Sequence, residues 1–500
     1  MTSDIRRLFL SSTPVGGRAI VNSDVAERRV LLNSRALMQV VVGLLWISTF
    51  LVVSYVVWTS RLLRPIADDY WIAVSAQDGL LEGVITWWQE WSGAVSTMTS
   101  NVLFVGLPLL HLPWSLASAV PFLCAMFLAV FATTWIFVQA IPKHPERRGF
   151  VIASLLFPIL AVVWWGYWWL PALQAGDSDD TYRLALGVTH WQSINAGYVI
   201  PIVLLIWLWL VLETRHGVKF RRIWAIYLLL GILAGFNGPT FAGAAFLTIV
   251  VLAVASGLGS QKAVRARGWC WVMTLLGILF GALASYFSPG SQYRTTYLAN
   301  PDLNAVLISQ WLTQAVPGGV SDWIRAAINP GAIVLLVVIV GYTAILVHLG
   351  FRPNARLLLT VGFALLGFAL IASLVNRFAQ FFAYQAFWHL TGPQTIAWLG
   401  LTAIAMGIGA YVAINVQQAQ TRPVAVLGCA IGLLLFVSSI TLMTQTILTR
   451  SVQWESGPAP LSGIEDIENS SGWVMAEWVK LRTLRDAPMR GSADDDSMPG

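Results

Sequence analysis

The chain has 500 residues and a formal net charge of +6, with 57% hydrophobic and only 11% charged residues. Soluble domains carry about 25% charged residues, so this composition excludes an ordinary soluble enzyme. The positive charge does not indicate nucleic-acid binding, because the basic residues lie mostly in short loops between hydrophobic segments. The three cysteines, Cys124, Cys270 and Cys429, lie in or beside those segments and show neither a disulfide framework nor a metal-ligand spacing.

Apolar runs along the chain predict an all-α polytopic membrane protein with about eleven transmembrane helices. A helix needs roughly 20 apolar residues to cross a hydrocarbon core of about 30 Å. Three parts follow: an N-terminal segment at 1–35, a transmembrane domain at 36–446, and a C-terminal tail at 447–500 whose end is expected to be disordered. The predicted spans are 36–59, 113–141, 150–170, 197–212, 223–237, 239–258, 269–287, 331–350, 357–375, 394–416 and 423–446.

The distribution of Lys and Arg predicts how these spans are oriented. With the N-terminus inside, the inner segments between spans and at the N-terminus hold 19 basic residues and the four outer loops hold 6. Basic residues concentrate on the cytoplasmic side of membrane proteins. We therefore expect a multi-pass protein of the bacterial inner membrane, with a cytoplasmic N-terminus and an extracytoplasmic C-terminus.

Two adjacent carboxylates, Asp68 and Asp69, follow the first span and precede Tyr70. An acidic residue at the membrane edge is a candidate functional group by default. The alternative is that Asp68 caps a short helix running into Tyr70 and Trp71. In the functional reading, one carboxylate accepts a proton from an acceptor hydroxyl, and its neighbour orients the acceptor or holds a divalent cation.

Residues 78–92, which include Leu80, Leu81, Trp87, Trp88 and Trp91, place apolar side chains at mostly helical spacing. This pattern predicts an amphipathic helix at the membrane interface. An ordinary belt of interfacial tryptophans explains many of the 25 Trp residues without any function.

Three basic residues, His190, Arg294 and Arg377, lie in the later outer loops. The sequence Phe287-Ser-Pro-Gly-Ser-Gln-Tyr-Arg294 breaks a helix, and free backbone amides beside Arg294 suit phosphate oxygens. A helix stop with a snorkelling Arg is the alternative. Arg377 has the same two readings, a phosphate ligand or a snorkelling side chain. His190 is either an interfacial residue with its hydrogen bonds satisfied or a group that faces a cavity.

These parts suit glycosyl transfer from a lipid-linked sugar. A polyprenyl-phosphate donor needs a cation for its phosphate, an apolar surface for its lipid, and a carboxylate base for the acceptor. No Gly-rich nucleotide-binding loop is visible in the sequence, which argues against a nucleotide-sugar donor.

The arrangement resembles the GT-C superfamily of membrane glycosyltransferases, and most closely a bacterial GT-C-like family with three short motifs. The matching blocks are Ala67-Asp68-Asp69-Tyr70, Trp91-Ser92-Gly93 and Pro289-Gly290-Ser291-Gln292-Tyr293-Arg294. Ala94 stands where that family has Arg, and Ser291 stands where it has Asn. A further block, usually Asn followed by an acid between two spans, appears here as Asn237-Gly238 without the acid.

The resemblance, which covers roughly residues 40–390, implies catalytic acids at Asp68 and Asp69. From the residues themselves we expect Arg294, with Arg377 as a second candidate, to bind the donor phosphate. We expect the substrate cleft to include Tyr70, Trp91, Ser92, His190, Asn237, Gly290 and Tyr293. The expected partners are membrane lipid, the lipid-linked donor, and a glycan, lipid or protein acceptor of the cell envelope. A transporter or flippase, or a non-catalytic envelope assembly protein, is the competing hypothesis.

Overall fold

The structure is a computed structural model of the whole chain. It describes residues 43, 46–47, 49–58, 72–73, 75–90, 92–112, 114–141, 152–153, 155–164, 195–214, 223–259, 261–292, 311–327, 330–348, 351–382 and 391–415. The chain divides into two units, 1–48 and 49–500, and every feature described below lies in the second unit.

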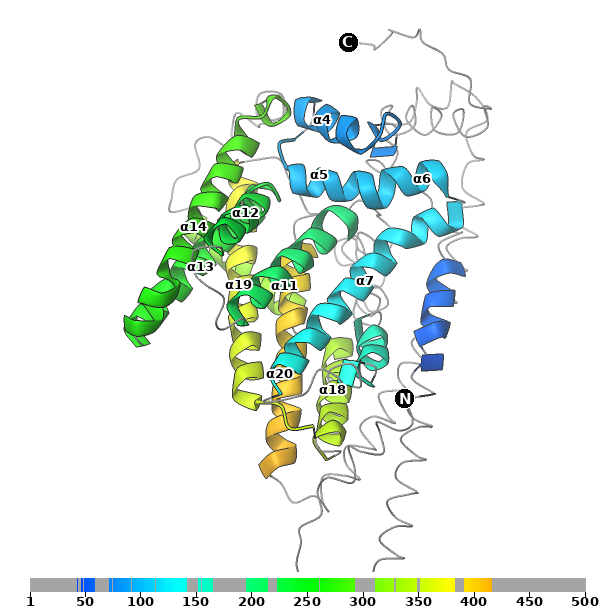
Figure 1. Cartoon of the computed structure of the whole chain (residues 1–500), viewed down its shortest axis with the longest axis vertical. Helices are drawn as coiled ribbons and strands as arrows, with labels where there is room; N and C mark the ends of the chain where they lie inside the picture. Colours follow the sequence, from blue (N-terminus) through cyan, green and yellow to red (C-terminus); the bar gives the residue numbers. More distant parts are fainter. Residues whose placement is uncertain are drawn as a thin grey trace, which may run out of the picture. The chain divides into compact units, whose positions relative to one another are not determined.

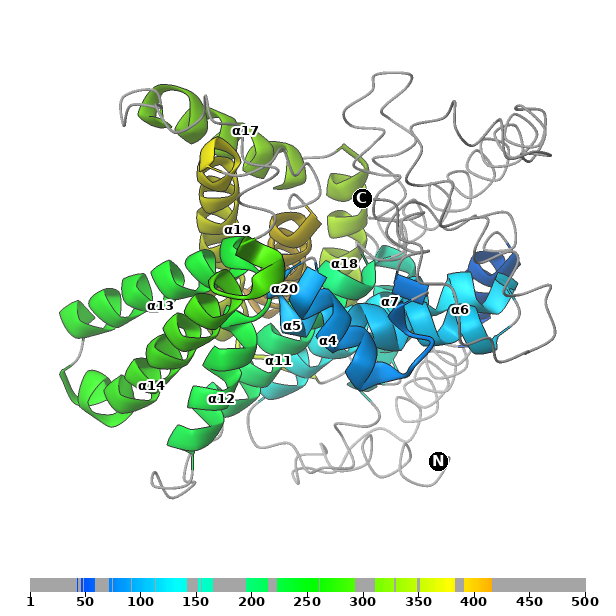
Figure 2. The ribbon, with the colours of Figure 1, turned by 90° about the horizontal axis from the view of Figure 1, so that it is seen from above.

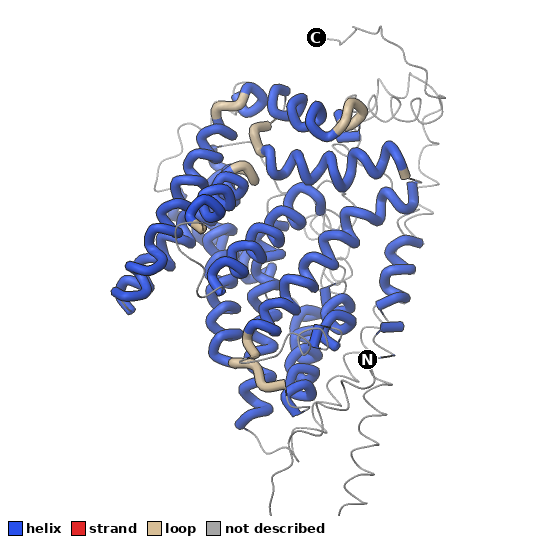
Figure 3. The backbone as a smooth tube through the Cα atoms, viewed as in Figure 1, coloured by secondary structure: helices blue, strands red, loops and turns tan. Residues whose placement is uncertain are grey.

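Regular structure in the described residues is entirely helical (Figure 3). The first group of helices is α4 (Leu80–Glu90), α5 (Val95–Asn101), the π-helix η1 (Val102–Gly106), α6 (Leu107–His111) and α7 (Trp114–Gln139). The second group is the π-helix η2 (Asn195–Val199), α11 (Ile200–Thr214), α12 (Trp224–Gly235), α13 (Pro239–Gly259) and α14 (Gln261–Tyr286). The third group is the π-helix η5 (Trp311–Ala315), α17 (Val316–Ala327), α18 (Pro330–His348), α19 (Ala355–Phe382) and α20 (Thr391–Asn415).

Among the described residues, five helices are long and apolar enough to cross a membrane. They are Ala119–Gln139, Asn195–Glu213, Gly268–Tyr286, Ala355–Phe378 and Gly392–Asn415. Five shorter apolar helices overlap further predicted spans: Thr49–Trp58, Leu155–Trp164, Trp224–Gly235, Thr240–Val254 and Ala332–His348. The predicted span 423–446 lies outside the described residues. The all-α membrane class is therefore supported, and the number of eleven spans stays a prediction.

Close glycine contacts join the helices in pairs. α12 packs along α14, and a Cβ atom added at Gly231 would lie only 2.3 Å from the backbone oxygen of Thr274. α19 packs along α20 in the same manner, and a Cβ atom added at Gly362 would lie 2.8 Å from the backbone oxygen of Gly400. In Figures 1 and 2, α12, α13 and α14 lie side by side, while α20 packs among α18, α19 and α7. Small residues that allow backbones to approach are the usual means of helix packing in membranes.

The turn between α12 and α13 is as tight as the sequence requires. Only Phe236, Asn237 and Gly238 separate the two helices, and Gly238 has a φ of 97°. Most side chains are strained in that conformation, so glycine is the residue that permits this turn.

The first predicted outer loop contains more helix than the sequence indicated. The predicted helix over 78–92 is confirmed as α4, with Gly83 and Trp87 buried. A further apolar helix, Val95–His111, was not predicted and runs across the view above α7 (Figure 1). Its sequence contains Gly106, Pro108 and a polar run at 96–101, which together hide its helical pattern. The chain crosses the Gly106–Pro108 region by combining the π-helix η1 with α6.

Candidate functional site

Two of the sequence motifs meet in the structure at the end of α14. The backbone N–H of Gly93 donates a hydrogen bond to Ser291 Oγ, with 2.9 Å between N and O. Gly93 also presses against the α14 terminus, since an added Cβ would lie 2.2 Å from the Ser285 oxygen and 2.5 Å from Ser288 Oγ. Any side chain at position 93 would therefore push the two segments apart. Ser92 and Gly290, both predicted cleft residues, thus belong to neighbouring turns.

The helix break after α14 keeps its backbone amides occupied. Ser288 Oγ accepts a hydrogen bond from the Ser291 amide at 3.2 Å and donates one to the Ser285 oxygen at 2.8 Å. The Gln292 amide donates to the Ser288 oxygen at 3.0 Å. The expectation of free amides for a phosphate is therefore wrong at positions 291 and 292, because a serine cap replaces the lost helix bonds.

The Asn237-Gly238 motif joins the same end of the bundle through α5. Thr97 Oγ1 donates to Asn237 Oδ1 at 2.9 Å, across 140 residues of sequence. Beside this bond, the Ser96 amide donates to the Phe236 oxygen at 3.2 Å and Ser96 Oγ donates to the Leu233 oxygen at 2.7 Å. We call this region, where α5, the 236–238 turn and the end of α14 meet, the α5 end.

Buried polar side chains gather at the α5 end. Thr97, Ser100, Asn101, Asn195 and Asn237 are all buried. Ser100 Oγ donates to the Ala196 oxygen at 2.5 Å, and an atom added at Gly197 would lie 2.8 Å from Asn101 Nδ2. η2 therefore lies directly against α5.

Two of these amides retain hydrogen-bonding capacity. Asn101 Oδ1 and Asn237 Nδ2 are buried atoms that make no hydrogen bond. Buried polar atoms are nearly always satisfied, and exceptions commonly mark functional positions or sites for water.

Asn237 lines a small pocket of about 30 Å³ with Tyr198, Thr240, Gly392 and Pro393. That volume suits a single water molecule or hydroxyl group rather than a whole sugar. Ala372 also lines this pocket, slightly more than one helical turn before Arg377 on α19. The pocket connects the motif residues with the segment that carries Arg377.

Arg377 forms a forked ion pair with Asp322 of α17. Its Nε and Nη2 atoms donate to the two carboxylate oxygens at 2.5 and 2.8 Å, and the Asp322 carboxylate is almost fully buried. Such bidentate pairs hold both partners in a fixed geometry. The pair assigns Arg377 a role in joining α17 to α19, and its role in phosphate binding stays a prediction.

The structure also shows the surroundings of Ala94 and Ser291, the two positions that differ from the motifs quoted above. Ala94 belongs to an apolar cluster with Ile72, Trp87, Met98 and Ala196, where a guanidinium would be buried among hydrocarbon groups. Ser291 Oγ accepts the hydrogen bond from the Gly93 amide. An Asn side chain also carries an oxygen that accepts hydrogen bonds.

Several predicted site residues lie outside the described residues: Asp68, Asp69, Tyr70, Trp91, His190, Tyr293 and Arg294. Sequence reasoning missed Thr97, Ser100, Asn101 and Asp322. The first three lie in the run Val95-Ser-Thr-Met-Thr-Ser-Asn101, where polar residues precede an apolar stretch. A polar cluster leading into an apolar helix was the available signal.

Comparisons with protein-family models, with curated proteins and with solved structures found no match for this chain.

Proposed function

We propose that the chain is a membrane glycosyltransferase that moves a sugar from a polyprenyl-phosphate-linked donor to an acceptor of the cell envelope. The reaction takes place on the outer face of the membrane. The acceptor is a glycan, lipid or protein hydroxyl, and Asp68 or Asp69 takes its proton.

The observation that carries the proposal is the convergence of separate motifs at the α5 end. Ser92-Gly93, Asn237-Gly238 and Pro289-Gly290-Ser291 are far apart in sequence, yet hydrogen bonds connect α5 and the Gly93 turn to both later blocks. Two buried amide atoms at the same place, Asn101 Oδ1 and Asn237 Nδ2, make no hydrogen bond, and each such atom destabilises a fold by about 1–3 kcal/mol. Packing alone gives no reason to place them there.

We propose that the carboxylate pair lies close to this region, which the length of the intervening chain allows. Ile72 packs in the cluster of Trp87, Ala94 and Met98. Asp69 precedes Ile72 by three residues, so its Cα atom lies within about 11 Å of the Ile72 Cα atom. A base near the α5 end is consistent with this limit.

The test begins with the donor. Lipid extracted from the purified full-length protein is identified by mass spectrometry, and a polyprenyl-phosphate sugar found there becomes the substrate of a transfer assay in vesicles. Replacing the base by Asn, in Asp68→Asn or Asp69→Asn, is expected to lower turnover about 10²- to 10⁴-fold. Folded yield should not change, because Asn keeps the size and much of the hydrogen bonding of Asp.

Full transfer by both Asn variants would refute the carboxylate mechanism. Loss of folded protein in both would support the capping role of the pair instead. Passage of the donor across the vesicle membrane without sugar transfer would favour a flippase.

Arg294 provides a second check, on donor binding. Arg294→Ala should weaken donor binding more than Arg294→Lys, because Lys keeps the charge but loses the planar fork. Equal donor affinity in the wild type and both variants would remove Arg294 from the site.

A further inference from the structure

The small pocket at Asn237 lies at the beginning of two long helices. Thr240 of α13 and Gly392 and Pro393 of α20 line the pocket, and all three lie within the first three residues of their helices. These helices are 21 and 25 residues long. The first N–H groups of a helix have no partner within it, and they give its N-terminus a partial positive charge. Two such N-termini therefore meet at one pocket.

The start of α13 has no side-chain cap. The Gly238 carbonyl accepts a helical hydrogen bond from the Ala242 amide at 3.0 Å, which makes Gly238 the N-cap residue. Ser, Thr, Asn or Asp at an N-cap satisfies the first amides of a helix with a side-chain oxygen, and glycine has no such oxygen. A phosphate oxygen is a well-suited acceptor for amides at this position.

Asn237 adds a donor whose direction is fixed by its partner. Its Oδ1 accepts the hydrogen bond from Thr97 Oγ1 of α5 at 2.9 Å, whereas its buried Nδ2 makes no hydrogen bond. The residue is only 2% exposed. Asn237 lines the pocket and Thr97 does not. The amide thus presents its oxygen to α5, and we infer that its NH₂ group faces the pocket.

The other walls of the pocket are compatible with a negative charge. Among the described residues, those that line it include no Asp or Glu, and Tyr198 and Thr240 contribute hydroxyl groups. Its volume of about 30 Å³ accommodates one oxygen atom. Tyr198 and Gly238 are partly exposed, so the remainder of a larger group can extend from that side.

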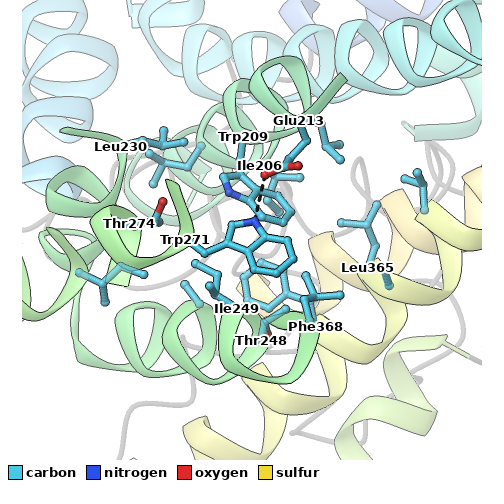
Figure 4. A pocket seen from close by; sticks show the side chains of 18 of the residues that line it. Ile206, Trp209, Glu213, Leu230, Thr248, Ile249, Trp271, Thr274, Leu365 and Phe368 are labelled. Carbon is cyan, nitrogen blue, oxygen red and sulfur yellow. Dashed lines mark hydrogen bonds between the residues drawn. The ribbon is translucent and has the colours of Figure 1, made fainter. Parts of the chain in front are cut away.

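A larger cavity of about 270 Å³ lies among α11, α12, α13, α14 and α19 and differs in charge (Figure 4). Its walls include Glu213, whose Oε1 accepts hydrogen bonds from Trp271 Nε1 at 3.1 Å and from the Tyr227 hydroxyl at 3.3 Å. A carboxylate at this place repels an anion. Phe241 lines both spaces, and of the two only the Asn237 pocket has the charge that suits an anionic oxygen.

We propose that the Asn237 pocket receives one phosphate oxygen of the polyprenyl-phosphate-linked donor. Asn237 Nδ2 and the first amides of α13 donate hydrogen bonds to this oxygen, and the N-termini of α13 and α20 stabilise its charge. The inference rests on the proposed function for the identity of the donor. It gives the donor phosphate a site that does not depend on Arg377, whose guanidinium is held by Asp322.

The test measures binding of farnesyl phosphate, a short polyprenyl phosphate, to the full-length protein in maltoside micelles, which contain no phosphate. Farnesyl phosphate should bind about tenfold or more tightly than farnesol, because only the phosphate makes charge-assisted hydrogen bonds. Hydrogen exchange followed by mass spectrometry should show slower exchange in the peptide that contains Thr240 and Phe241. Inorganic phosphate, which lacks the chain, should give the same protection only at a much higher concentration.

A matched pair of variants tests the donor group. Asn237→Asp keeps an acceptor for Thr97 but replaces the NH₂ group by an oxygen that carries negative charge, so affinity for farnesyl phosphate should fall about tenfold or more. Asn354→Asp adds the same charge at the exposed N-cap of α19, about 27 Å along that helix from Ala372 of the pocket. Affinity should not change in this control, because Asp is also an effective N-cap.

Three results would overturn the proposal. Equal affinity of the wild type and Asn237→Asp would remove the amide from the site. Equal binding of farnesol and farnesyl phosphate would remove the phosphate. Protection by inorganic phosphate at the same concentration as farnesyl phosphate would assign the pocket to free phosphate instead of the donor.

Two further outcomes separate this site from the proposed function. If Asn237→Asp does not fold, hydrogen exchange of the wild type with farnesyl phosphate and farnesol decides. Phosphate-dependent protection without sugar transfer in the vesicle assay would refute the glycosyltransferase and uphold the phosphate site. Sugar transfer without that protection would uphold the enzyme and refute the site.

Discussion

Gly93 and Ser291 are joined by a 2.9 Å hydrogen bond that spans 198 residues of sequence. The amide of one motif thus donates to the side chain of another, and the glycine lies so close to Ser285 that no larger residue fits. This contact holds the turn between α4 and α5 against the end of α14. Removing the hydrogen bond therefore tests whether the segments that form the α5 end depend on one another.

We expect Ser291→Ala to destabilise the protein by about 1–3 kcal/mol, because it leaves the buried Gly93 amide without its acceptor. Hydrogen exchange followed by mass spectrometry should show faster exchange in the peptide that contains Gly93. Gly93→Ala should destabilise at least as much, by overpacking. Gly268→Ala is the control, since a Cβ there meets nothing within 4 Å. Unchanged exchange at Gly93 in the Ser291 variant would contradict the hydrogen bond.

The Arg377–Asp322 pair predicts strong coupling between α17 and α19. Removing one partner, in Arg377→Ala or Asp322→Ala, should destabilise the protein by about 3–5 kcal/mol, because the other charge stays partly or wholly buried. The double variant should be less destabilised than the sum of the two single variants. Chemical unfolding in detergent micelles measures the coupling. Additive effects would show that the pair contributes little, and Arg377 would then be available for another ligand.

The buried side-chain amide of Asn376 should make the native protein less stable than an apolar side chain of similar size would. It is fully buried on α19, and neither its Oδ1 nor its Nδ2 makes a hydrogen bond. Asn376→Leu should therefore raise the free energy of unfolding by about 1–3 kcal/mol. Asn415→Leu is the matched control at the exposed end of α20, where the Asn415 amide already donates to the Tyr411 oxygen. A lower melting temperature for Asn376→Leu would show that the amide has a stabilising partner in the folded protein.

The orientation predicted from the basic residues can be tested by cysteine labelling. Gln77 lies in the predicted outer loop and Arg352 in a predicted inner loop, and both side chains are exposed. In a variant without the native cysteines, Gln77→Cys should react with an impermeant reagent in intact cells. Arg352→Cys should react only after the membrane is opened. The reverse pattern would place the α5 end on the cytoplasmic side and refute the proposed outer-face reaction.

Sequence alone determined the membrane class, most helix positions and the tight turn at Asn237-Gly238. These properties depend on runs of apolar residues and on glycine at a positive φ, which are local features of the chain. It also singled out Ser92, Asn237 and Gly290 before their surroundings were known.

Only the tertiary structure decided which of these residues meet. Helical periodicity cannot show that Gly93 lies against Ser285 or that Thr97 donates to Asn237, because those contacts depend on how distant helices pack. The pairing of Arg377 with Asp322 was equally hidden, since a lone Arg at a helix end reads the same whether it snorkels, binds phosphate or finds a carboxylate. The apolar helix Val95–His111 escaped prediction for a related reason. The hydroxyl groups of Ser96, Thr97 and Ser100 at its polar start donate to the 233–237 segment and η2, and local sequence does not reveal those partners.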